Sequence, residues 1–184
     1  MALACSLNKD ILKGTNCEYK LNSVTEIWLA QGMGATITMA SGSTDGECKS
    51  YIDDIKLSGK GNKWYHIIPE KNTASYSDVL NVTDAGAKYR THTLSFTIGD
   101  ADPCVIDGLV FGSYLAIAVF ADGSAIMLGT PTAPLEATAV NQNGAANPTE
   151  ASGVSVEMSR EVTQTALPIS KGKLATITGA AAVD

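Results

Sequence analysis

Apolar residues are most densely grouped between positions 102 and 129, which read DPCVIDGLVFGSYLAIAVFADGSAIMLG. The Asp102-Pro103 pair is typical of a helix start, with Asp as the N-cap and Pro at the first helical position. Four apolar residues then share one helical face: Val105, Ile106, Leu109 and Val110. We expect Gly112 to end this helix in a left-handed conformation.

The rest of this segment predicts a buried hairpin. Leu115 to Phe120 is apolar throughout, as expected of a strand that is covered on both faces. Asp122-Gly123 is a strong signal for a tight turn, and a second apolar strand follows it. The segment carries no reactive side chain, so we expect it to serve packing and assembly.

Two other segments alternate between apolar and polar residues, which predicts strands with one buried face. In Lys88–Ile98 the apolar positions are Leu94, Phe96 and Ile98, and the polar positions are Thr93, Ser95 and Thr97. In Gly153–Glu161 the inward positions are Val154, Val156 and Met158, and the outward positions are Ser155, Glu157 and Ser159. The outward face of the first strand is polar but uncharged, which suits a wet surface or a subunit contact.

Weaker patterns of apolar and polar residues predict the remaining elements of the chain. Val24–Ala30 and Ala35–Met39 are predicted to pair as a hairpin, and Tyr51–Leu57 and Lys63–Ile68 are predicted strands around a turn at 58–62. Short strands are expected at Ser77–Val82 and Leu135–Thr138, inside the long connections 69–86 and 130–152. The remaining segments are an N-terminal arm (1–16), a loop (40–50) and a loose C-terminal tail (171–184). These elements predict one domain over 1–184, mainly β, built as an antiparallel β-sandwich or open barrel with one flanking α-helix.

Composition narrows the classes of function. The 184 residues are 45% hydrophobic and only 17% charged, with a formal net charge of −6. High-affinity binding to duplex nucleic acid requires a basic footprint, so this balance argues against it. No apolar run approaches the length of a membrane helix, and the first ten residues lack the pattern of a secretory signal. We therefore expect no membrane partner.

The four cysteines, at positions 5, 17, 48 and 104, lack C-x-x-C spacing, which argues against a zinc or redox centre. We interpret them as buried free thiols, with a Cys5–Cys17 disulfide as the alternative.

The search for catalytic chemistry finds no enzyme signature. His66 and His92 are interpreted as strand residues held by local hydrogen bonds, and no nucleotide-binding, hydrolase or zinc-protease motif occurs. Four acidic residues, Asp45, Glu47, Asp53 and Asp54, lack calcium-loop spacing and are interpreted as solvated. Four aromatic residues, Trp28, Trp64, Tyr65 and Tyr89, are interpreted as packing residues rather than a binding platform. We expect no cofactor, no metal and no enzyme activity.

The order of the elements resembles a phage major tail tube protein. The resemblance rests on the strand KYRTHTLSFTI, the helix around PCVIDGLVFG, the strand YLAIAVF, the turn ADG, the strand SAIMLG, and then a long loop and GVSVEMSRE. The segments NCEYKLNSVTEIWLA and WYHIIPEKNTASYSDVLNV fit the same scheme, so the similarity covers most of residues 11–168. It is closest to the form found in phages and prophages of Bacteroidetes-type hosts, and it is related to the tubes of contractile injection and type VI secretion systems. One departure is Asn22-Ser23, where a Gly pair is more typical.

The resemblance implies a tail-tube-like fold and a structural role in the virion tail, assembled in the host cytoplasm. Six copies would join their sheets edge to edge in a ring with a continuous inner barrel, and rings would stack into a tube. The expected partners are other copies of the chain, a tape-measure protein, a tail terminator and, in a contractile tail, a sheath. Genome DNA would pass through the lumen without specific binding, and a net charge of −6 has the right sign for that.

Within this framework, strand phase assigns candidate lumen-facing residues: Thr91, Thr93, Ser95, Thr97 and Glu157. The loops 40–54 and 130–152 are long enough to reach a neighbouring ring. The candidate inter-ring residues of the first loop are Ser43, Asp45, Glu47, Asp53 and Asp54.

Two other classes of function stay open at this point. One is a capsid decoration or tail-terminator protein, which would form trimers or single rings rather than tubes. The other is a non-viral β-sandwich module that binds carbohydrate through Trp28 or Trp64.

Overall fold

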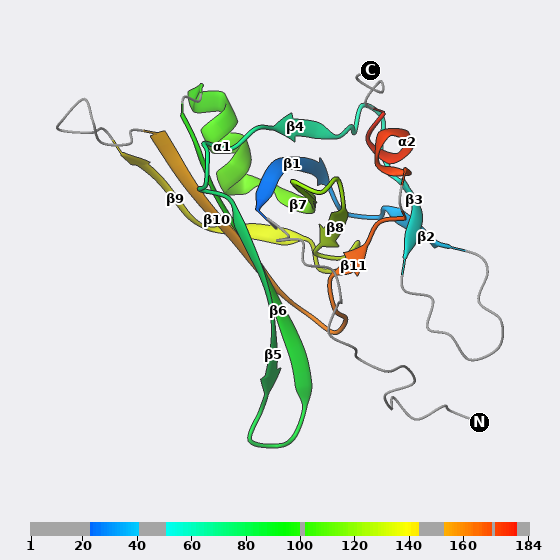
Figure 1. Cartoon of the computed structure of the whole chain (residues 1–184). Coiled ribbons are helices and arrows are strands. Elements are labelled where there is room, and N and C mark those ends of the chain that lie inside the picture. The colour runs from blue at the N-terminus through cyan, green and yellow to red at the C-terminus, as the bar shows by residue number, and fades with distance from the viewer. Residues whose placement is uncertain (1–22, 41–50, 100–101, 144–152, 171, 180–184) are drawn as a thin grey trace, which may run out of the picture.

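The chain folds into a mainly antiparallel β structure with a helix on its flank (Figure 1). The computed structural model describes residues 23–40, 51–99, 102–143, 153–170 and 172–179. The strands are β1 (Val24–Gln31), β2 (Thr36–Met39), β3 (Ile52–Lys56), β4 (Tyr65–Ile67), β5 (Ser75–Val82), β6 (Lys88–Ile98), β7 (Ser113–Phe120), β8 (Ala125–Leu128), β9 (Leu135–Asn143), β10 (Gly153–Val162) and β11 (Leu167–Pro168). The helices are α1 (Pro103–Phe111) and α2 (Leu174–Thr178).

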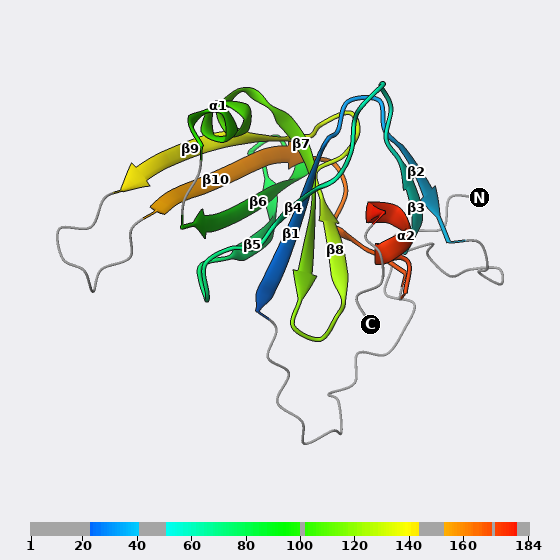
Figure 2. The same ribbon diagram turned by 90° about the horizontal axis from the view of Figure 1, so that it is seen from above.

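Strand β7 lies at the centre of the nine-stranded sheet and pairs with three other strands. It pairs with β1 along one edge, with β8 along part of the other edge, and with the start of β9 beyond that. From β9 the sheet continues through β10 and β6 to β5, whereas β4 is attached to β1. In Figure 2 the section β9-β10-β6-β5 and the section β1-β7-β8 run in clearly different directions. Among the described residues these sections do not close into a barrel, so the fold is the open, sandwich-like alternative.

Two apolar cores lie on opposite faces of β7. Ala116, Ala118 and Phe120 belong to the core that also holds Leu94, Phe96 and Leu109. Leu115, Ile117 and Val119 belong to a second core with Ile52, Trp64 and Met127. Every residue from Leu115 to Phe120 is buried, which confirms the prediction of a strand covered on both faces. Full burial of each large aliphatic side chain stabilises the fold by roughly 1.5–3 kcal/mol.

Helix α1 begins as its sequence predicts. The Asp102 carboxylate accepts a hydrogen bond from the Cys104 backbone N–H at 2.8 Å, and Pro103 occupies the first turn. Leu109 is buried and Ile106 packs against the first core, whereas Val105 and Val110 are exposed. Only half of the predicted apolar face is therefore covered within the described part of the chain.

The end of α1 differs from the prediction. Gly112 has φ −83° and ψ 159°, so it is extended and not left-handed. The Tyr114 ring lies against it, and a Cβ atom at position 112 would come within 2.2 Å of that ring. Glycine is required here for close approach rather than for a positive φ.

The Asp122-Gly123 turn is confirmed. The Phe120 N–H donates to the Ser124 carbonyl at 2.8 Å, and Gly123 adopts φ 76°. The Asp122 carboxylate accepts hydrogen bonds from the Ser124 N–H and hydroxyl, which fixes the turn locally. This turn sets the register of β7 against β8.

The predicted pairing of the first two strands is wrong. β2 pairs with β3 in a separate two-stranded sheet, because β4 and β7 occupy the two edges of β1. Gly32 marks the change of direction: its N–H donates to the Ser113 carbonyl, and a Cβ there would lie 2.9 Å from Leu115. The two strands around the turn at 58–62 also pair with different partners rather than with each other.

Three segments are more ordered than their composition predicts. β5 spans eight residues and β9 spans nine, each longer than the short strand expected inside a loop. Both pair with the clearly alternating strands β6 and β10, and this tertiary pairing outweighs weak local propensity. In the tail that was expected to be loose, helix α2 buries Ile177 against the second core. The arm 1–16 and the loop 40–50, apart from Ala40, lie outside the described residues.

Candidate functional site

A polar face on the four strands β5, β6, β10 and β9 is the main candidate site; we call it the polar sheet face. The register places Thr93 opposite Ser159, Ser95 opposite Glu157, and Thr97 opposite Ser155. On the other side of β6, Ser75 lies opposite Ser95 and Ser77 opposite Thr93. The structure thus brings together the five predicted lumen-facing residues, Thr91, Thr93, Ser95, Thr97 and Glu157, on one face of paired strands.

The outward positions of the polar sheet face carry acidic and no basic residues in the described part of the chain. The acidic residues are Glu157 and Glu161 on β10 and Glu136 on β9, which lies opposite Ser159. Lys88, Arg90 and Arg160 occupy the alternate positions, but Arg160 Nη1 reaches Glu136 Oε2 at 2.7 Å and so neutralises one of these three carboxylates. The electrostatic potential along this face is therefore neutral to negative.

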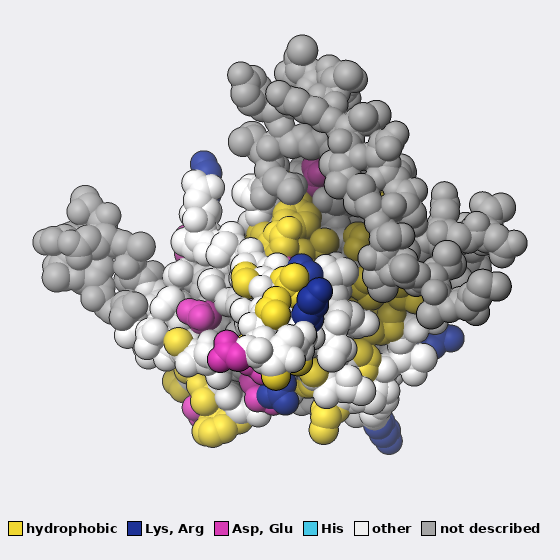
Figure 3. Space-filling model, turned by 90° about the horizontal axis from the view of Figure 1, so that it is seen from below, with side chains coloured by type: hydrophobic (Ala, Val, Ile, Leu, Met, Phe, Trp, Pro, Cys, Tyr) yellow, Lys and Arg dark blue, Asp and Glu magenta, His cyan; other side chains and the backbone are white. Residues whose placement is uncertain are grey.

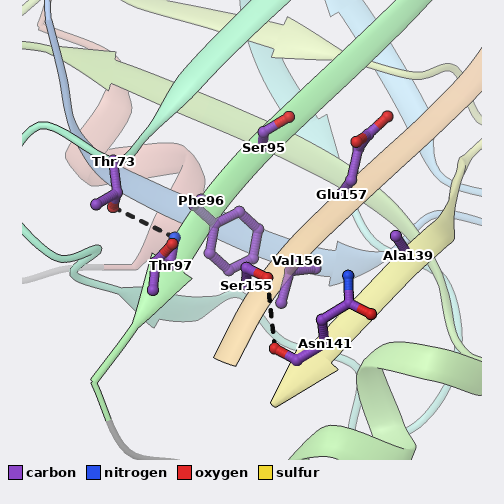
Figure 4. A pocket seen from close by; sticks show the side chains of 9 residues that line it. All are labelled: Thr73, Ser95, Phe96, Thr97, Ala139, Asn141, Ser155, Val156 and Glu157. Atoms are coloured by element: carbon purple, nitrogen blue, oxygen red, sulfur yellow. Dashed lines mark hydrogen bonds between the residues drawn. The ribbon is translucent and has the colours of Figure 1, made fainter. Parts of the chain in front are cut away.

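A small hollow lies in the polar sheet face (Figure 4). It has a volume of about 150 Å³, and residues with hydroxyl, amide and carboxylate side chains line it. Figure 4 shows Ser95 and Glu157 projecting to the same side from neighbouring strands. The Ser155 hydroxyl donates to the Asn141 carbonyl at 3.4 Å, and the Thr97 N–H donates to the Thr73 hydroxyl at 3.3 Å. These groups form neutral hydrogen bonds within the sheet, and the hollow has no histidine or cysteine in its lining.

An ionic cluster lies on the other face of the β5–β6 pair. The Asp78 carboxylate binds the Arg90 guanidinium and accepts hydrogen bonds from the Thr165 hydroxyl at 2.6 Å and the Ala166 N–H at 3.0 Å. His92, only 1% exposed, accepts a hydrogen bond on Nδ1 from the Gly129 N–H at 3.1 Å, and its Nε2 lies 3.6 Å from Asp78 Oδ1. The cluster connects the β5–β6 hairpin to Thr165 and Ala166, which follow β10 in the chain.

The pKa values in this cluster follow from its burial and its charges. Burial lowers the pKa of His92, and Arg90 adds to this shift, whereas Asp78 and the backbone of Gln164 oppose it. Burial by itself would raise the pKa of Asp78, but hydrogen bonds from Arg90, Thr165 and Ala166 lower it overall. His92 is therefore neutral and Asp78 charged at neutral pH.

Other residues singled out in the sequence have structural roles. His66 Nε2 lies 3.0 Å from the Glu26 carboxylate, and its ring stacks on Trp28 with centroids 4.1 Å apart. Trp64 is buried in the second core, which leaves no shared aromatic platform with Tyr65 or Tyr89. The interpretation of both tryptophans as packing residues is confirmed.

The acidic residues 45–54 are only partly within the described chain. Asp53 and Asp54 lie in β3 rather than in a loop, and Asp53 Oδ1 lies 3.5 Å from Lys173 Nζ. Ser43, Asp45 and Glu47 lie outside the described residues. No group of three potential metal ligands occurs among the side chains that the structure describes.

Cys104 corrects the expectation of buried thiols. It is free, as predicted, but it is exposed on the first turn of α1. The other three cysteines, and with them the alternative Cys5–Cys17 disulfide, lie outside the described residues.

A groove between α1 and β4 was not foreseen from the sequence; we call it the α1–β4 groove. It has a volume of about 620 Å³, and its lining includes Leu29, Ile67 and Leu109 together with the turn 58–62. The Tyr114 hydroxyl lies at the groove and donates to the Gly108 carbonyl at 2.6 Å. Because the lining comes from β1, β4, β7 and α1, no local sequence pattern marks it.

Comparison with known proteins identifies no relative of this chain. No family model, no curated protein and no solved structure matches this chain. Among the described residues, neither helix is long and apolar enough to cross a membrane.

Proposed function

We propose that this chain is the subunit of a phage tail tube, in which stacked hexameric rings form a conduit for genome DNA. The observation that carries the proposal is the polar sheet face. Four adjacent strands present hydroxyls, amides and the carboxylates of Glu136, Glu157 and Glu161 on one side. In the described residues of these strands, the only basic group paired with this side is the Arg160 guanidinium, which is bound to Glu136. A wall that lets a polyanion slide must not bind phosphate, and Lys or Arg would do so.

The free edges of the same four strands supply a means of ring closure. β5 is the last strand of the sheet, and it exposes Val79 and Leu80 by about half. At the other end, β9 pairs with β7 only through Leu135 and Glu136, so most of its outer edge has no strand partner among the described residues. Exposed strand edges drive association unless they are covered. Pairing of β5 in one copy with β9 in the next would cover both edges and place the polar sheet face on the inside of a ring.

Electron microscopy of the purified protein tests this function. We expect rings with sixfold symmetry or stacked tubes with a continuous lumen. A protein that stays monomeric at all concentrations, and that is absent from virions, would rule the proposal out. Single rings that never stack, with a low copy number in the virion, would instead favour a tail-terminator role.

A substitution on the β5 edge tests the mode of closure. Leu80→Lys places a charge on that edge and is expected to abolish rings while the monomer stays folded. Met33→Lys is the matched control, because Met33 is also exposed, at 72%, but lies in the turn after β1. Loss of rings with the control variant, or normal rings with Leu80→Lys, would contradict closure through β5.

A further inference from the structure

Helix α1 presents a face that is apolar and acidic; we call it the α1 outer face. It consists of Asp107, Val110 and Phe111, whose i, i+3 and i+4 spacing places them on one side of the helix. All three residues are exposed, and Phe111 is 84% exposed. Leu109 points to another side of the helix, where it is buried in the first core. Aromatic side chains are enriched at contacts between proteins, so the α1 outer face is a candidate contact surface.

The β5–β6 hairpin presents a second face, which is apolar and basic; we call it the hairpin outer face. The register pairs Leu80 with Arg90 and Val82 with Lys88. These four side chains leave the sheet on the same side as Leu94, which is buried in the first core. Figure 3 looks onto this end of the molecule and shows hydrophobic side chains beside Lys and Arg side chains at its centre. Because Leu80 and Val82 are 51% and 59% exposed, no described part of the chain covers this face.

The two outer faces carry opposite charges. α1 contains no basic residue, and Asp107 is the acidic member of its outer face. On the hairpin outer face, Arg90 is bound to Asp78, so Lys88 supplies the remaining positive charge. Asp84 lies in the turn beyond the last pair of β5 and β6, and therefore outside the paired strands. Neither Asp107 nor Lys88 takes part in an ion pair among the described residues.

Both outer faces lie on the side of the sheet opposite the polar sheet face. Leu109 of α1 and Val140 of β9 pack in the first core, so α1 covers β9 from this side. Leu80 and Val82 lie on the same side at the β5 end of the sheet. Figure 2 shows α1 beside β9, with β5 at the far end of the section β9-β10-β6-β5. When β5 of one copy pairs with β9 of the next, the two outer faces therefore meet along the outside of the seam.

The lengths and directions of β5 and β9 specify where the faces meet. Successive strands from β5 to β9 are antiparallel, so β5 of one copy runs antiparallel to β9 of the next. β5 has eight residues, and β9 has nine, with a register shift against β10. An alignment that starts with Ser75 opposite Asn143, and skips one residue at the shift, keeps the serines and asparagines on the polar sheet face and puts Leu80 opposite Ala137. Beyond Ala137, β7 occupies the edge of β9, so Val82 passes the end of α1.

We propose that the α1 outer face of one copy packs against the hairpin outer face of the next copy in the same ring, and so covers the β9–β5 seam from outside. The inference rests on the tube function proposed above, and it names the surface that α1 contributes to the ring contact. The occupant is a second copy because the two faces carry opposite charges and lie on the same side of the sheet, at the two ends that join. Phe111 covers Leu80 and Val82, which supplies the attraction, and Asp107 pairs with Lys88, which fixes the orientation.

Disulfide trapping tests the contact between copies. Leu80→Cys combined with Val110→Cys, in a Cys104→Ser background, leaves Phe111, Val82 and both charges in place. Mild oxidation should give a ladder of covalent multimers that ends at six on a non-reducing gel, because the contact closes within one ring. Peptide mass spectrometry should find positions 80 and 110 linked. The link cannot form within one chain, because the hairpin and α1 lie at opposite ends of the molecule (Figure 1).

The trapping experiment has a matched control. Ser124→Cys in place of Leu80→Cys puts the thiol in the exposed turn between β7 and β8, and it should give no link to position 110. Rings of the trapping variant that form normally but yield no 80–110 peptide would overturn the proposal while the ring function stands. A ladder of 80–110 links that runs past six would also overturn it, because the contact would then join different rings.

Charge exchange tests the pairing of Asp107 with Lys88. Asp107→Lys or Lys88→Asp alone should raise the protein concentration needed for half-maximal ring assembly roughly tenfold, because the repulsive contact recurs at every seam. The two changes together should restore assembly. Lys56→Asp, on an exposed residue of β3, is the matched control and should have little effect.

The outcomes separate this contact from the tube function. Single variants that assemble like the wild type, or a double variant no better than the single ones, would overturn the contact while the ring function stands. Absence of rings from the wild-type protein would overturn the tube function and, with it, this contact.

Discussion

The Tyr114 hydroxyl donates a hydrogen bond to the backbone carbonyl of Gly108 at 2.6 Å, which ties strand β7 to the last turns of helix α1. Burial, and to a lesser degree Tyr65, raises the pKa of Tyr114, so the hydroxyl stays a donor through neutral pH. Tyr114→Phe removes the bond and leaves the ring in place, and it should destabilise the fold by about 1 kcal/mol. Urea unfolding measures this change. Tyr51→Phe, on an exposed tyrosine, is the control and should be close to neutral.

Substitution by alanine should lower the stability of the fold at Gly112 and raise it at Gly108. At position 112 the new Cβ would overlap the Tyr114 ring, and overpacking of this kind should cost roughly 1–3 kcal/mol. At position 108 the nearest atom is the Tyr114 hydroxyl oxygen at 3.9 Å, an ordinary contact, so Gly108→Ala should stabilise the helix by about 0.5–1 kcal/mol. Thermal unfolding of the two variants side by side checks the difference. Equal effects would show that the Tyr114 ring does not limit position 112.

The Asp78 cluster should make the fold sensitive to acid. Because the pKa of His92 is lowered on folding, the unfolded chain takes up a proton first, and stability should fall as the pH drops below about 6.5. The lowered pKa of Asp78 adds a second loss, which begins as the pH falls toward 3.8. Urea midpoints between pH 7.5 and 5 should therefore decrease. His92→Gln should flatten this slope.

Removal of the Asp78 charge should loosen the hairpin. Asp78→Asn leaves Arg90 without its ionic partner and weakens the hydrogen bonds to Thr165 and Ala166, at a cost of about 1–3 kcal/mol. Hydrogen exchange should show faster exchange in β5 than in β7. Uniform acceleration over the whole sheet would indicate that the cluster supports global stability rather than the hairpin alone.

The polar sheet face should tolerate hydroxyls but not cations. Ser95→Arg places a guanidinium on that face, and assembled tubes of the variant should bind short duplex DNA at low salt and release it as salt rises. Wild-type tubes should not bind it. Ser124→Arg, in the β7–β8 turn, adds the same charge away from this face and serves as the control. DNA binding by the control but not by Ser95→Arg would contradict the proposal that this face lines the lumen of a tube.

The sequence predicts best those elements whose local residue pattern favours the same structure as their packing in the folded protein. Strand β6 matches its predicted bounds because strict alternation lets one face enter the first core. The N-cap at Asp102 and the turn at Gly123 are equally local, since each depends on hydrogen bonds within a few residues.

The failures share a physical cause, which is dependence on distant partners. The sequence predicts that β2 pairs with β1 because they are neighbours along the chain, but β4 and β7 occupy both edges of β1. Asp78 lies in the short strand predicted at Ser77–Val82, but its role depends on Thr165, a residue 87 positions away. Gly112 is the exception, because the Tyr114 ring that excludes a Cβ there lies only two residues further along the chain and is held by a hydrogen bond to Gly108. The polar sheet face was predictable from strand phase, whereas the α1–β4 groove was not.

The position of β7 at the centre of the sheet also bears on the order of events during synthesis. Its partner β1 is made first, yet the Thr25 hydroxyl bonds the Val119 carbonyl across 94 residues of chain. β6 likewise cannot complete its pairing until β10 has been synthesised. Contacts between residues so far apart in sequence make folding slow. A nascent chain that ends before β10 would carry unpaired edges on both β6 and β9. We therefore expect ribosome-bound fragments to be captured by chaperones, and only finished chains to enter assembly.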